Sequence, residues 1–418
     1  MTPGLAKLFT EHEMVSRRWL LRAGALGAAA LGTWTLDAAE RTPELEAAIA
    51  DLETYMTLQD DFQDVSRGKP KPHSLPDETK RKVGLTRDTW KLNVTSDPDH
   101  PARLRAPMSA EKGNALTFAA LMEIASQHAV RFPKVMTCLN IGCPLGMGIW
   151  EGVPLREVLW LTQPTENLRR VFFYGYHNDD PKQMFRSSLP VGRVLEDPFE
   201  LPPVILCYKL NGEWLNSERG GPVRIVVPEA YGFKSIKWLS NLVLSNIWHA
   251  NDTYGTQNND VDSPLKSFAA TLGVPRQLKP NSPFAVTGYA QVGISGLSKV
   301  QVWIQPEDEK WDRDDRYFSK APWVDAEILP PPTKWGGGLS LDSIPPATHG
   351  FNETGQPHRW PMRLAKVHWA VMLPGLRAGK YVLRSRTIDE KGHPQPLPRP
   401  FRKSGHSAIE RMPITVEA

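Results

Sequence analysis

The sequence predicts an α+β protein with two unlike domains, a mixed α/β domain followed by an immunoglobulin-like β-sandwich. In the first part of the chain, strand and helix patterns lack the regular alternation of a doubly wound parallel sheet. Beyond about residue 268, short segments alternate apolar and polar residues with a period of two, separated by turns rich in Gly, Pro and Asp. The 38 prolines and 31 glycines among 418 residues agree with many loops and short strands.

The length suits two globular domains preceded by an extension. We expect a signal segment at 1–39, an N-terminal extension at 40–66, the mixed domain at 67–268 and the β-sandwich at 269–418. The net charge is only +4, and no basic stripe with interleaved aromatic residues occurs, so the sequence predicts no nucleic-acid partner.

The N-terminus has the pattern of a Tat-type export signal. Arg17 and Arg18 precede a short, weakly apolar run rich in Ala and Gly at 23–31. This run is shorter than the roughly 20 residues of a membrane span. The alternative is an ordinary amphipathic helix that happens to carry two arginines. We expect export to the periplasm or another extracytoplasmic space, with cleavage near Ala38 and Ala39.

Hydrophobic periodicity places the elements in order. In the mixed domain we expect helices over Leu116–Ala125 and Val153–Leu161, and strands at Thr89–Val94, Lys134–Thr137, Val171–Tyr174, Val204–Tyr208 and Val223–Val227, with core residues continuing over Ser235–Leu244. Asn211 and Gly212 predict a tight turn. In the sandwich we expect strands at Phe284–Ala290, Val300–Ile304, His368–Met372 and Tyr381–Arg386.

The usual nucleotide and zinc motifs are missing. Gly375–Lys380 has one residue too few between its glycines for a phosphate-binding loop and is better explained as a hairpin turn. The sequence contains no His-Glu-x-x-His and no paired Cys-x-x-Cys, so it predicts no zinc site.

Cys138 is the residue with the most chemical interest. It ends a predicted strand and begins a loop containing Gly142, where a thiolate can face a cavity from a fixed position. Soft thiolates bind soft or high-valent metal–sulfur centres. From the residues alone, a buried core thiol and a Cys138–Cys143 disulfide remain alternatives.

Several segments, taken together and in order, resemble the sulfite oxidase family of molybdenum-cofactor oxidoreductases. They are Cys138 with Trp150-x-Gly152-x-x-Leu155, Tyr208-x-x-Asn211-Gly212, the Pro-Val-Arg strand at Gly221–Pro228, Ser235-x-Lys237-Trp238, and the late-strand segments Arg386–Asp389 and Gly392–Pro396. The resemblance covers about residues 62–418 and implies the two-domain fold, a molybdenum–molybdopterin cofactor, and a C-terminal dimerisation domain that would make a homodimer.

The resemblance also implies roles for single residues. Cys138 would be the thiolate ligand of molybdenum, and Tyr208 would place its hydroxyl beside the metal as a donor or proton relay. The pterin and its phosphate would be held by five residues, Arg219, Arg224, Ser235, Ile236 and Lys237. Three cations are candidate substrate residues: Arg67, which would also line the active site, and Arg402 and Lys403.

The sequence departs from the family pattern after Cys138. Sulfite oxidases continue with Ala-Gly-Asn-Arg-Arg, whereas this chain has Leu139-Asn140-Ile141-Gly142-Cys143 and no arginine. One anion-binding cation is therefore missing, which puts sulfite in doubt as the substrate. The short spacing from Cys138 to Trp150 is more similar to the methionine-sulfoxide reductase branch.

Three hypotheses follow. The first is a periplasmic enzyme that transfers an oxygen atom to or from a small sulfur compound. It would exchange electrons with a separate cytochrome or heme membrane subunit, since the chain has no Cys-x-x-Cys-His. The second is a reductase of sulfoxides such as oxidised methionine. The third is a cofactor-free secreted binding protein that kept only the fold.

Overall fold

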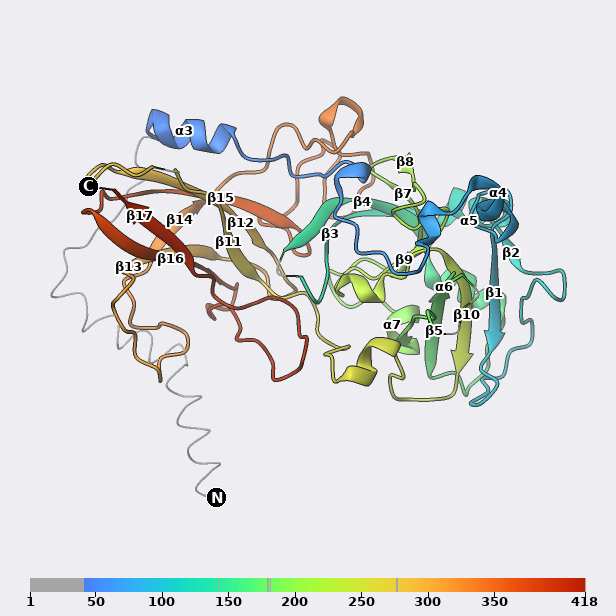
Figure 1. Ribbon diagram of the computed structural model, residues 1–418. Coiled ribbons are helices and arrows are strands. Elements are labelled where there is room, and N and C mark those ends of the chain that lie inside the picture. Colours follow the sequence, from blue (N-terminus) through green and yellow to red (C-terminus); the bar gives the residue numbers. More distant parts are fainter. Residues whose placement is uncertain (1–40, 142, 179, 181, 276, 418) are drawn as a thin grey trace, which may run out of the picture.

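A computed structural model describes residues 41–417 except 142, 179, 181 and 276. This part of the chain forms two lobes that lie side by side (Figure 1). The predicted signal segment with Arg17 and Arg18 lies outside the described residues. Within the described residues, no helix has both the length and the apolarity to span a membrane.

The N-terminal extension contacts both lobes. Helix α3 (Pro43–Ala50) is capped by the Thr42 side chain and packs its buried Leu45 against Ala285, Leu329 and Ala370 of the C-terminal lobe. The chain then crosses to the other lobe (Figure 1), where it forms η1 (Gln59–Asp61), η2 (Pro72–Ser74) and α4 (Asp77–Lys82). The extension therefore spans the junction between the lobes.

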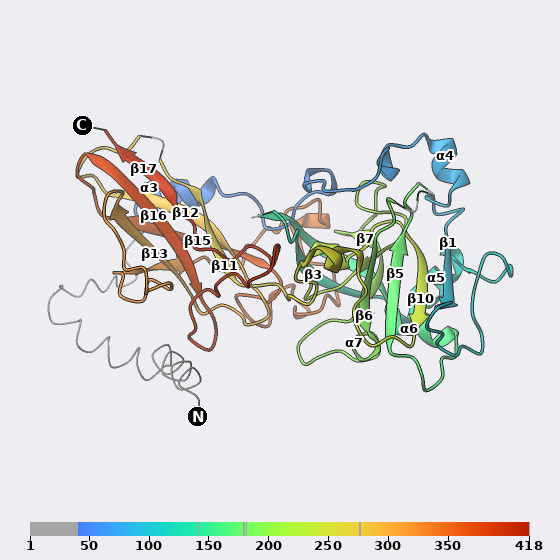
Figure 2. The same cartoon turned by 60° about the horizontal axis from the view of Figure 1, so that its bottom comes forward.

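The first lobe contains a mixed five-stranded sheet of order β2-β1-β10-β5-β6, in which β1 and β10 are parallel and the other pairs antiparallel. Figure 2 shows β1, β10 and β5 side by side. The strands are β1 (Lys91–Ser96), β2 (Leu116–Thr117), β5 (Arg170–Gly175), β6 (Arg186–Pro190) and β10 (Leu239–Ser245). Their apolar side chains share a buried core with residues of α5 (Phe118–His128), α6 (Leu155–Leu161) and α7 (Val191–Leu195).

A second sheet lies between this core and the other lobe. Its order is β3-β4-β7-β8, with β9 also paired to β7. The strands are β3 (Val130–Thr137), β4 (Pro144–Pro154), β7 (Ile205–Leu210), β8 (Glu213–Trp214) and β9 (Arg224–Val226). Two short helices, η3 (Gly232–Lys234) and η4 (Thr253–Gln257), follow in the loops beyond β9 and β10. Cys138 comes directly after β3, as the sequence predicts.

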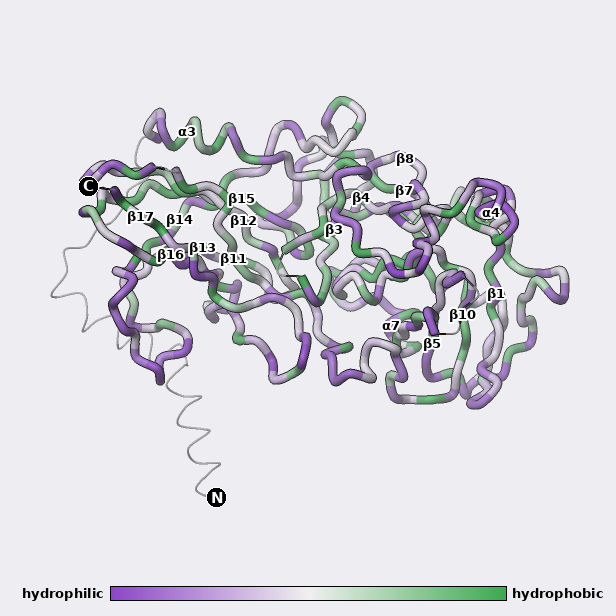
Figure 3. The backbone as a smooth tube through the Cα atoms, in the orientation of Figure 1, coloured by the Kyte–Doolittle hydropathy of each residue, from purple (hydrophilic) through white to green (hydrophobic). Residues whose placement is uncertain are grey.

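The C-terminal lobe is built on seven strands of order β11-β12-β15-β14-β13-β16-β17 around its own apolar core. They are β11 (Phe268–Gly273), β12 (Phe284–Gln291), β13 (Lys299–Pro306), β14 (Val324–Ile328), β15 (Lys366–Leu373), β16 (Gly379–Ile388) and β17 (Met412–Val416), with η5 (Ser340–Asp342) in a loop. A bridge between Leu278 and Val416 brings the two ends of this path together, so the sheet is nearly closed. Figure 3 shows hydrophobic segments along the strands and mainly hydrophilic loops at the periphery.

Two predicted helix starts were wrong. The helix expected from Leu116 begins at Phe118, because Thr117 accepts a hydrogen bond from the Ala120 amide and caps it, leaving Leu116 and Thr117 in β2. The helix expected from Val153 begins at Leu155, because Val153 and Pro154 still pair with β7. The core does continue over Ser235–Leu244, where Ile236, Leu242 and Leu244 are buried, but residues 235–238 are a loop before β10, in which Trp238 adopts a φ of 52°.

Candidate functional site

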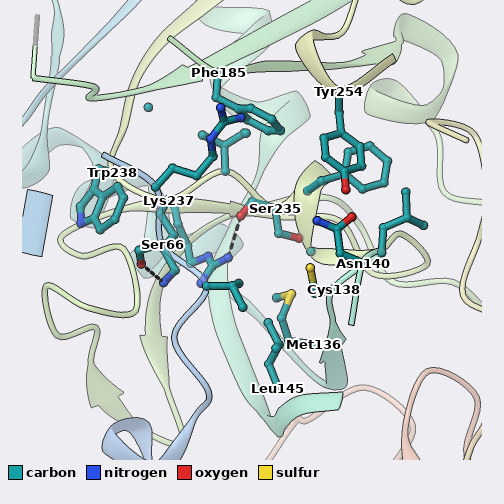
Figure 4. Close-up of a pocket in the computed structure, with 18 of the residues that line it drawn as sticks. Ser66, Met136, Cys138, Asn140, Leu145, Phe185, Ser235, Lys237, Trp238 and Tyr254 are labelled. Carbon is teal, nitrogen blue, oxygen red and sulfur yellow. Dashed lines mark hydrogen bonds between the residues drawn. The ribbon is translucent and has the colours of Figure 1, made fainter. Parts of the chain in front are cut away.

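A cavity of about 560 Å³ lies where loops of both lobes meet. Its wall is formed by residues 62–68, 136–141 and 232–238, by residues 253–257 around η4, and by Lys403 of the C-terminal lobe. Figure 4 shows side chains from these segments pointing into the same space. Residues that are far apart in the sequence therefore converge on one site.

Cys138 lies at a position fixed from both lobes. Thr137, the last residue of β3, donates from its buried hydroxyl to the Gln291 side chain of β12 at 2.5 Å. Gln291 in turn donates to the Lys266 carbonyl at 2.8 Å. Cys138 is half-buried and its thiol is free, and Figure 4 shows its sulfur close to Met136 and Asn140. A thiolate is thus presented to the cavity by a rigid strand end.

Arg224 lies on another wall of the cavity. The guanidinium of this buried residue donates to the Arg219 carbonyl at 2.7 Å and to the Ser235 carbonyl at 2.6 Å, and lies 5.2 Å from the Trp150 ring centroid. Burial lowers its pKa to about 10. Its Nε is buried and has no hydrogen-bond partner within the described part of the chain. A buried unpaired donor is costly, so this atom suits an acceptor on a bound group.

Arg219 continues the same basic wall. It donates from Nη1 to the Phe62 carbonyl at 2.9 Å and also pairs with Glu218. The Nε of Arg219, like the Nε of Arg224, is buried and has no hydrogen-bond partner among the described residues. Two neighbouring guanidinium groups therefore keep a free donor each.

Lys237 extends this basic wall. Its ammonium donates to Asp64 at 3.2 Å, to the Ser66 hydroxyl at 2.7 Å and to the Glu218 carbonyl at 2.7 Å. Burial, together with the charge of Arg224, lowers its pKa to about 7. Burial opposes ionisation of Asp64. Hydrogen bonds from Lys71 and Ser66 and the charge of Lys237 nevertheless hold the pKa of that carboxyl well below its usual range.

Aromatic residues and two cations form a further part of the cavity wall. The Arg67 guanidinium lies 4.8 Å from the Phe185 ring centroid, and the Lys403 ammonium lies 5.5 Å from that of Tyr254. Within the described residues, neither cation has a carboxylate at ion-pair distance. Both are therefore available to an anion that enters the cavity.

Tyr254 also lines the cavity. Its ring stacks on Phe233 with centroids 5.3 Å apart, and its hydroxyl is buried without a hydrogen-bond partner in the described structure. Burial raises its pKa to about 12, and a negative charge on nearby Cys138 acts in the same direction. The phenol is thus protonated at neutral pH and free to donate. Sequence reasoning missed Tyr254, which lies in a polar loop with no motif around it.

Most of the residues predicted from the sequence meet in this cavity. Those that line it are Arg67, Cys138, Arg219, Arg224, Ser235, Ile236, Lys237 and Lys403. Arg402 lines instead a neighbouring cavity of about 260 Å³, which shares residues 139–141 and Lys403 with the first. Cys143 does not line the cavity, although its thiol contacts Gln63, which does.

Tyr208 lies outside the cavity, which corrects its predicted place beside the metal. Successive residues of β7 face opposite sides, and Cys207 and Tyr208 belong to different apolar cores. Tyr208 packs against Trp214 and hydrogen-bonds Glu151, and burial raises the pKa of its phenol. The Tyr208 hydroxyl therefore makes its hydrogen bond inside the first lobe and does not face the cavity.

The donor set of the cavity fits a cofactor that carries both a soft metal and an anionic group. Cys138 offers a thiolate for the metal. Arg219, Arg224 and Lys237 offer charged donors of the kind that bind phosphate. Within the described residues, no three His, Cys, Asp or Glu side chains form a metal-binding group.

Comparisons with known proteins point to one family. A family model for the oxidoreductase molybdopterin binding domain matches residues 80–252. The chain is 31% identical to sulfite oxidase of Gallus gallus over 174 residues, which cover 37% of this chain and 37% of that protein. It is 26% identical to the NADH nitrate reductase of Volvox carteri over 263 residues, 50% of this chain and 30% of that protein. The matches thus cover less than two fifths of either relative.

The fold is similar over almost the whole chain to that of a solved protein. The sulfane dehydrogenase SoxCD from Paracoccus pantotrophus matches 94% of this chain and 97% of its own chain, with a TM-score of 0.55 and 16% identity. The likeness therefore extends over both lobes and beyond the residues matched by the family model.

Proposed function

Because this chain belongs to the sulfite-oxidase-type family of molybdenum–molybdopterin oxidoreductases, we propose that it transfers an oxygen atom to or from a small sulfur compound. The main observation behind the proposal is that three features line one cavity: Cys138, the basic wall of Arg219, Arg224 and Lys237, and the unpaired Tyr254 hydroxyl. When bound, the cofactor supplies the two-electron redox chemistry. The chain supplies binding, orientation and charge.

In this proposal Cys138 is the protein ligand of molybdenum. The pterin would lie along Ser235 and Ile236, and the charged donors of Arg219, Arg224 and Lys237 would hold its anionic end. The unpaired Nε atoms of both arginines support this assignment, because a bound acceptor would satisfy them. Lys237 keeps its charge beside a phosphate more readily than beside other cations, since the added negative charge raises its pKa.

Substrate would bind between Arg67, Lys403 and Tyr254. The two cations attract an anionic group, and the Tyr254 hydroxyl donates a hydrogen bond to an oxygen atom of the substrate near Cys138. The absent arginine after Cys138 leaves fewer cations than sulfite oxidases have in that loop. We therefore expect sulfite to bind poorly.

A sulfoxide reductase is the second candidate function. Phe185 and Phe233 form an aromatic wall beside Tyr254. Such a wall contacts an alkyl group attached to sulfur more favourably than it contacts a compact dianion. The third reading, a binding protein without cofactor, predicts no molybdenum in the purified protein.

Location and partners extend the proposal. Arg17 and Arg18 would direct export of the folded, cofactor-loaded protein, a separate heme protein would exchange electrons, and the C-terminal lobe would be an immunoglobulin-like dimerisation domain. Replacing both arginines with lysine should leave loaded protein in the cytoplasm. Unchanged periplasmic activity would count against export by this route.

The deciding experiment is metal and pterin analysis of protein from a molybdenum-replete host, followed by a substrate screen with artificial one-electron dyes. The panel holds sulfite, methionine sulfoxide, dimethyl sulfoxide and nitrate. We expect bound molybdenum and turnover of a sulfur compound. Protein that binds molybdenum but turns over only nitrate would refute the sulfur substrate, and protein without molybdenum would refute the enzyme.

A further inference from the structure

We propose that Asp260 is a positioning residue that clamps a loop of the C-terminal lobe over the cavity and so sets the place of Lys403 for anionic substrates. The inference rests on the proposed function for its substrate. We call the contacts that hold residues 398–406 against residues 258–266 the clamp.

The clamp holds three consecutive residues of the C-terminal loop. The Arg402 amide donates to the Asn258 carbonyl at 3.2 Å, and the Asp260 amide donates to the Lys403 carbonyl at 2.8 Å. The Lys266 ammonium donates to the Ser404 carbonyl. These backbone contacts leave the Lys403 side chain free to reach the cavity.

Charge at the clamp depends on one carboxylate. Asp260 is only 3% exposed and forms an ion pair of 3.1 Å with Arg399 of the same C-terminal loop. It also lies close enough to Lys266 to oppose the effect of burial, which lowers the pKa of that lysine to about 8. Without the carboxylate, the clamp would bring these two cations together uncompensated. Asp260 therefore stabilises the closed arrangement.

The same segment holds the substrate side of the cavity. Asn259, next to Asp260, donates from its side-chain amide to the Tyr254 carbonyl at 2.6 Å. The Lys403 ammonium in turn lies over the Tyr254 ring. One short stretch of chain thus fixes both the phenol and the cation, although they come from different lobes.

The glycine at the end of the clamp shows how closely the loop is packed. A Cβ on Gly405 would lie 2.2 Å from the Tyr231 hydroxyl, and Gly405 has a φ of +79°. The loop therefore has little room for an alternative path at this point. Loss of the Asp260 charge should loosen residues 398–404 rather than let them settle elsewhere.

The test compares Asp260→Asn with Asp262→Asn, a control that removes an exposed carboxylate two residues away that makes none of the contacts to residues 398–406. Asp260→Asn keeps its backbone amide, so only the charge changes. We expect faster amide hydrogen exchange in residues 398–406 and weaker binding of inorganic sulfate to the variant by about tenfold, the size expected when one charged contact is lost. The control should match the wild type in both.

Turnover gives a third readout. KM for an anionic substrate should rise by a similar factor in Asp260→Asn with little change in kcat, whereas KM for neutral dimethyl sulfoxide should stay constant. Asp260→Glu should restore part of the loss. Arg399→Gln should raise KM for the anionic substrate by a similar factor. The double variant of Asp260→Asn and Arg399→Gln should raise it no further than either single variant does.

Two results would overturn the inference. Unchanged exchange in residues 398–406 would show that Asp260 does not hold the loop. Faster exchange with unchanged sulfate binding would show that the loop does not position Lys403. Both measurements need no turnover, so they remain decisive if the proposed oxygen-transfer activity is not found.

Discussion

Tyr208 and Tyr254 are both buried phenols, but their hydroxyl groups meet different surroundings. Tyr208 bonds Glu151 within the core of the first lobe, whereas the Tyr254 hydroxyl faces no partner among the described residues and lies near Cys138. A residue needs a free hydroxyl at the cavity to donate to a substrate, so the geometry favours Tyr254.

Substituting each tyrosine tests this distinction. Tyr254→Phe should lower kcat by about a hundredfold, the usual size for loss of a proton donor, while molybdenum content is kept. Tyr208→Phe should keep kcat and cost about 1 kcal/mol of stability, because Glu151 loses a hydrogen bond. Steady-state kinetics and urea unfolding measure the two effects. A large loss of kcat in Tyr208→Phe alone would return the role to that residue.

The sequence predicted some site residues and missed others for a physical reason. Cys138, Arg224 and Lys237 lie at strand ends or in a loop, within short motifs that resemble those of the sulfite oxidase family. Tyr254 reaches the cavity only because η4 packs beside Phe233, and the chain around it carries no periodicity or motif. Tyr208 was assigned wrongly because its motif fixes a strand and a turn but not the face of β7 that meets the cavity.

About half of the strands were predicted, because alternation and β-branched residues mark them in the local sequence. The sequence analysis missed others, including β4, β6, β11, β14 and β17. The features that the local pattern did not predict depend on contacts with distant segments. β4 continues to Pro154 because β7 pairs with it, and the loop at 235–238 is set by the approach of β5, whose last residue is Gly175. A one-dimensional pattern does not contain these pairings.

Gly175 provides a test at this scale. A Cβ there would lie 2.1 Å from the Lys237 carbonyl oxygen, so Gly175→Ala must push the 235–238 loop away from β5. We expect a loss of about 1–3 kcal/mol of stability and a lower pterin content. Gly192→Ala in α7 is the control, since its Cβ would meet no atom within 4 Å. Urea unfolding and pterin analysis compare them, and equal behaviour of the two variants would contradict this account of the loop.

Across the whole molecule, the N-terminal extension ties the lobes together through Tyr55 and His368. The Tyr55 hydroxyl accepts from the His368 amide at 3.3 Å, and their rings lie 4.4 Å apart. Burial, helped by the charge of Lys366 and opposed by that of Glu53, lowers the pKa of His368 from 6.5 to about 4. The unfolded chain therefore takes up this proton at a higher pH than the folded protein does.

This difference predicts a loss of stability in acid. As pH falls from 6.5 to 4, the unfolded state gains protonated His368 first, so the free energy of unfolding should decrease by up to about 3 kcal/mol from this residue. His368→Gln should make the stability less dependent on pH in this window. The exposed His393 provides a control, and His393→Gln should leave the dependence in place. Urea unfolding at several pH values decides, and equal slopes for wild type and His368→Gln would refute the assignment.

The central claim is that Cys138 holds the molybdenum of a bound molybdopterin. X-ray absorption at the molybdenum edge tests it directly, because the method counts sulfur ligands without requiring a known substrate. We predict that the wild type has one sulfur ligand more than Cys138→Ser, with equal pterin content in both proteins. The same number of sulfur ligands in the two proteins, or a Cys138–Cys143 disulfide in metal-loaded wild type, would contradict the claim.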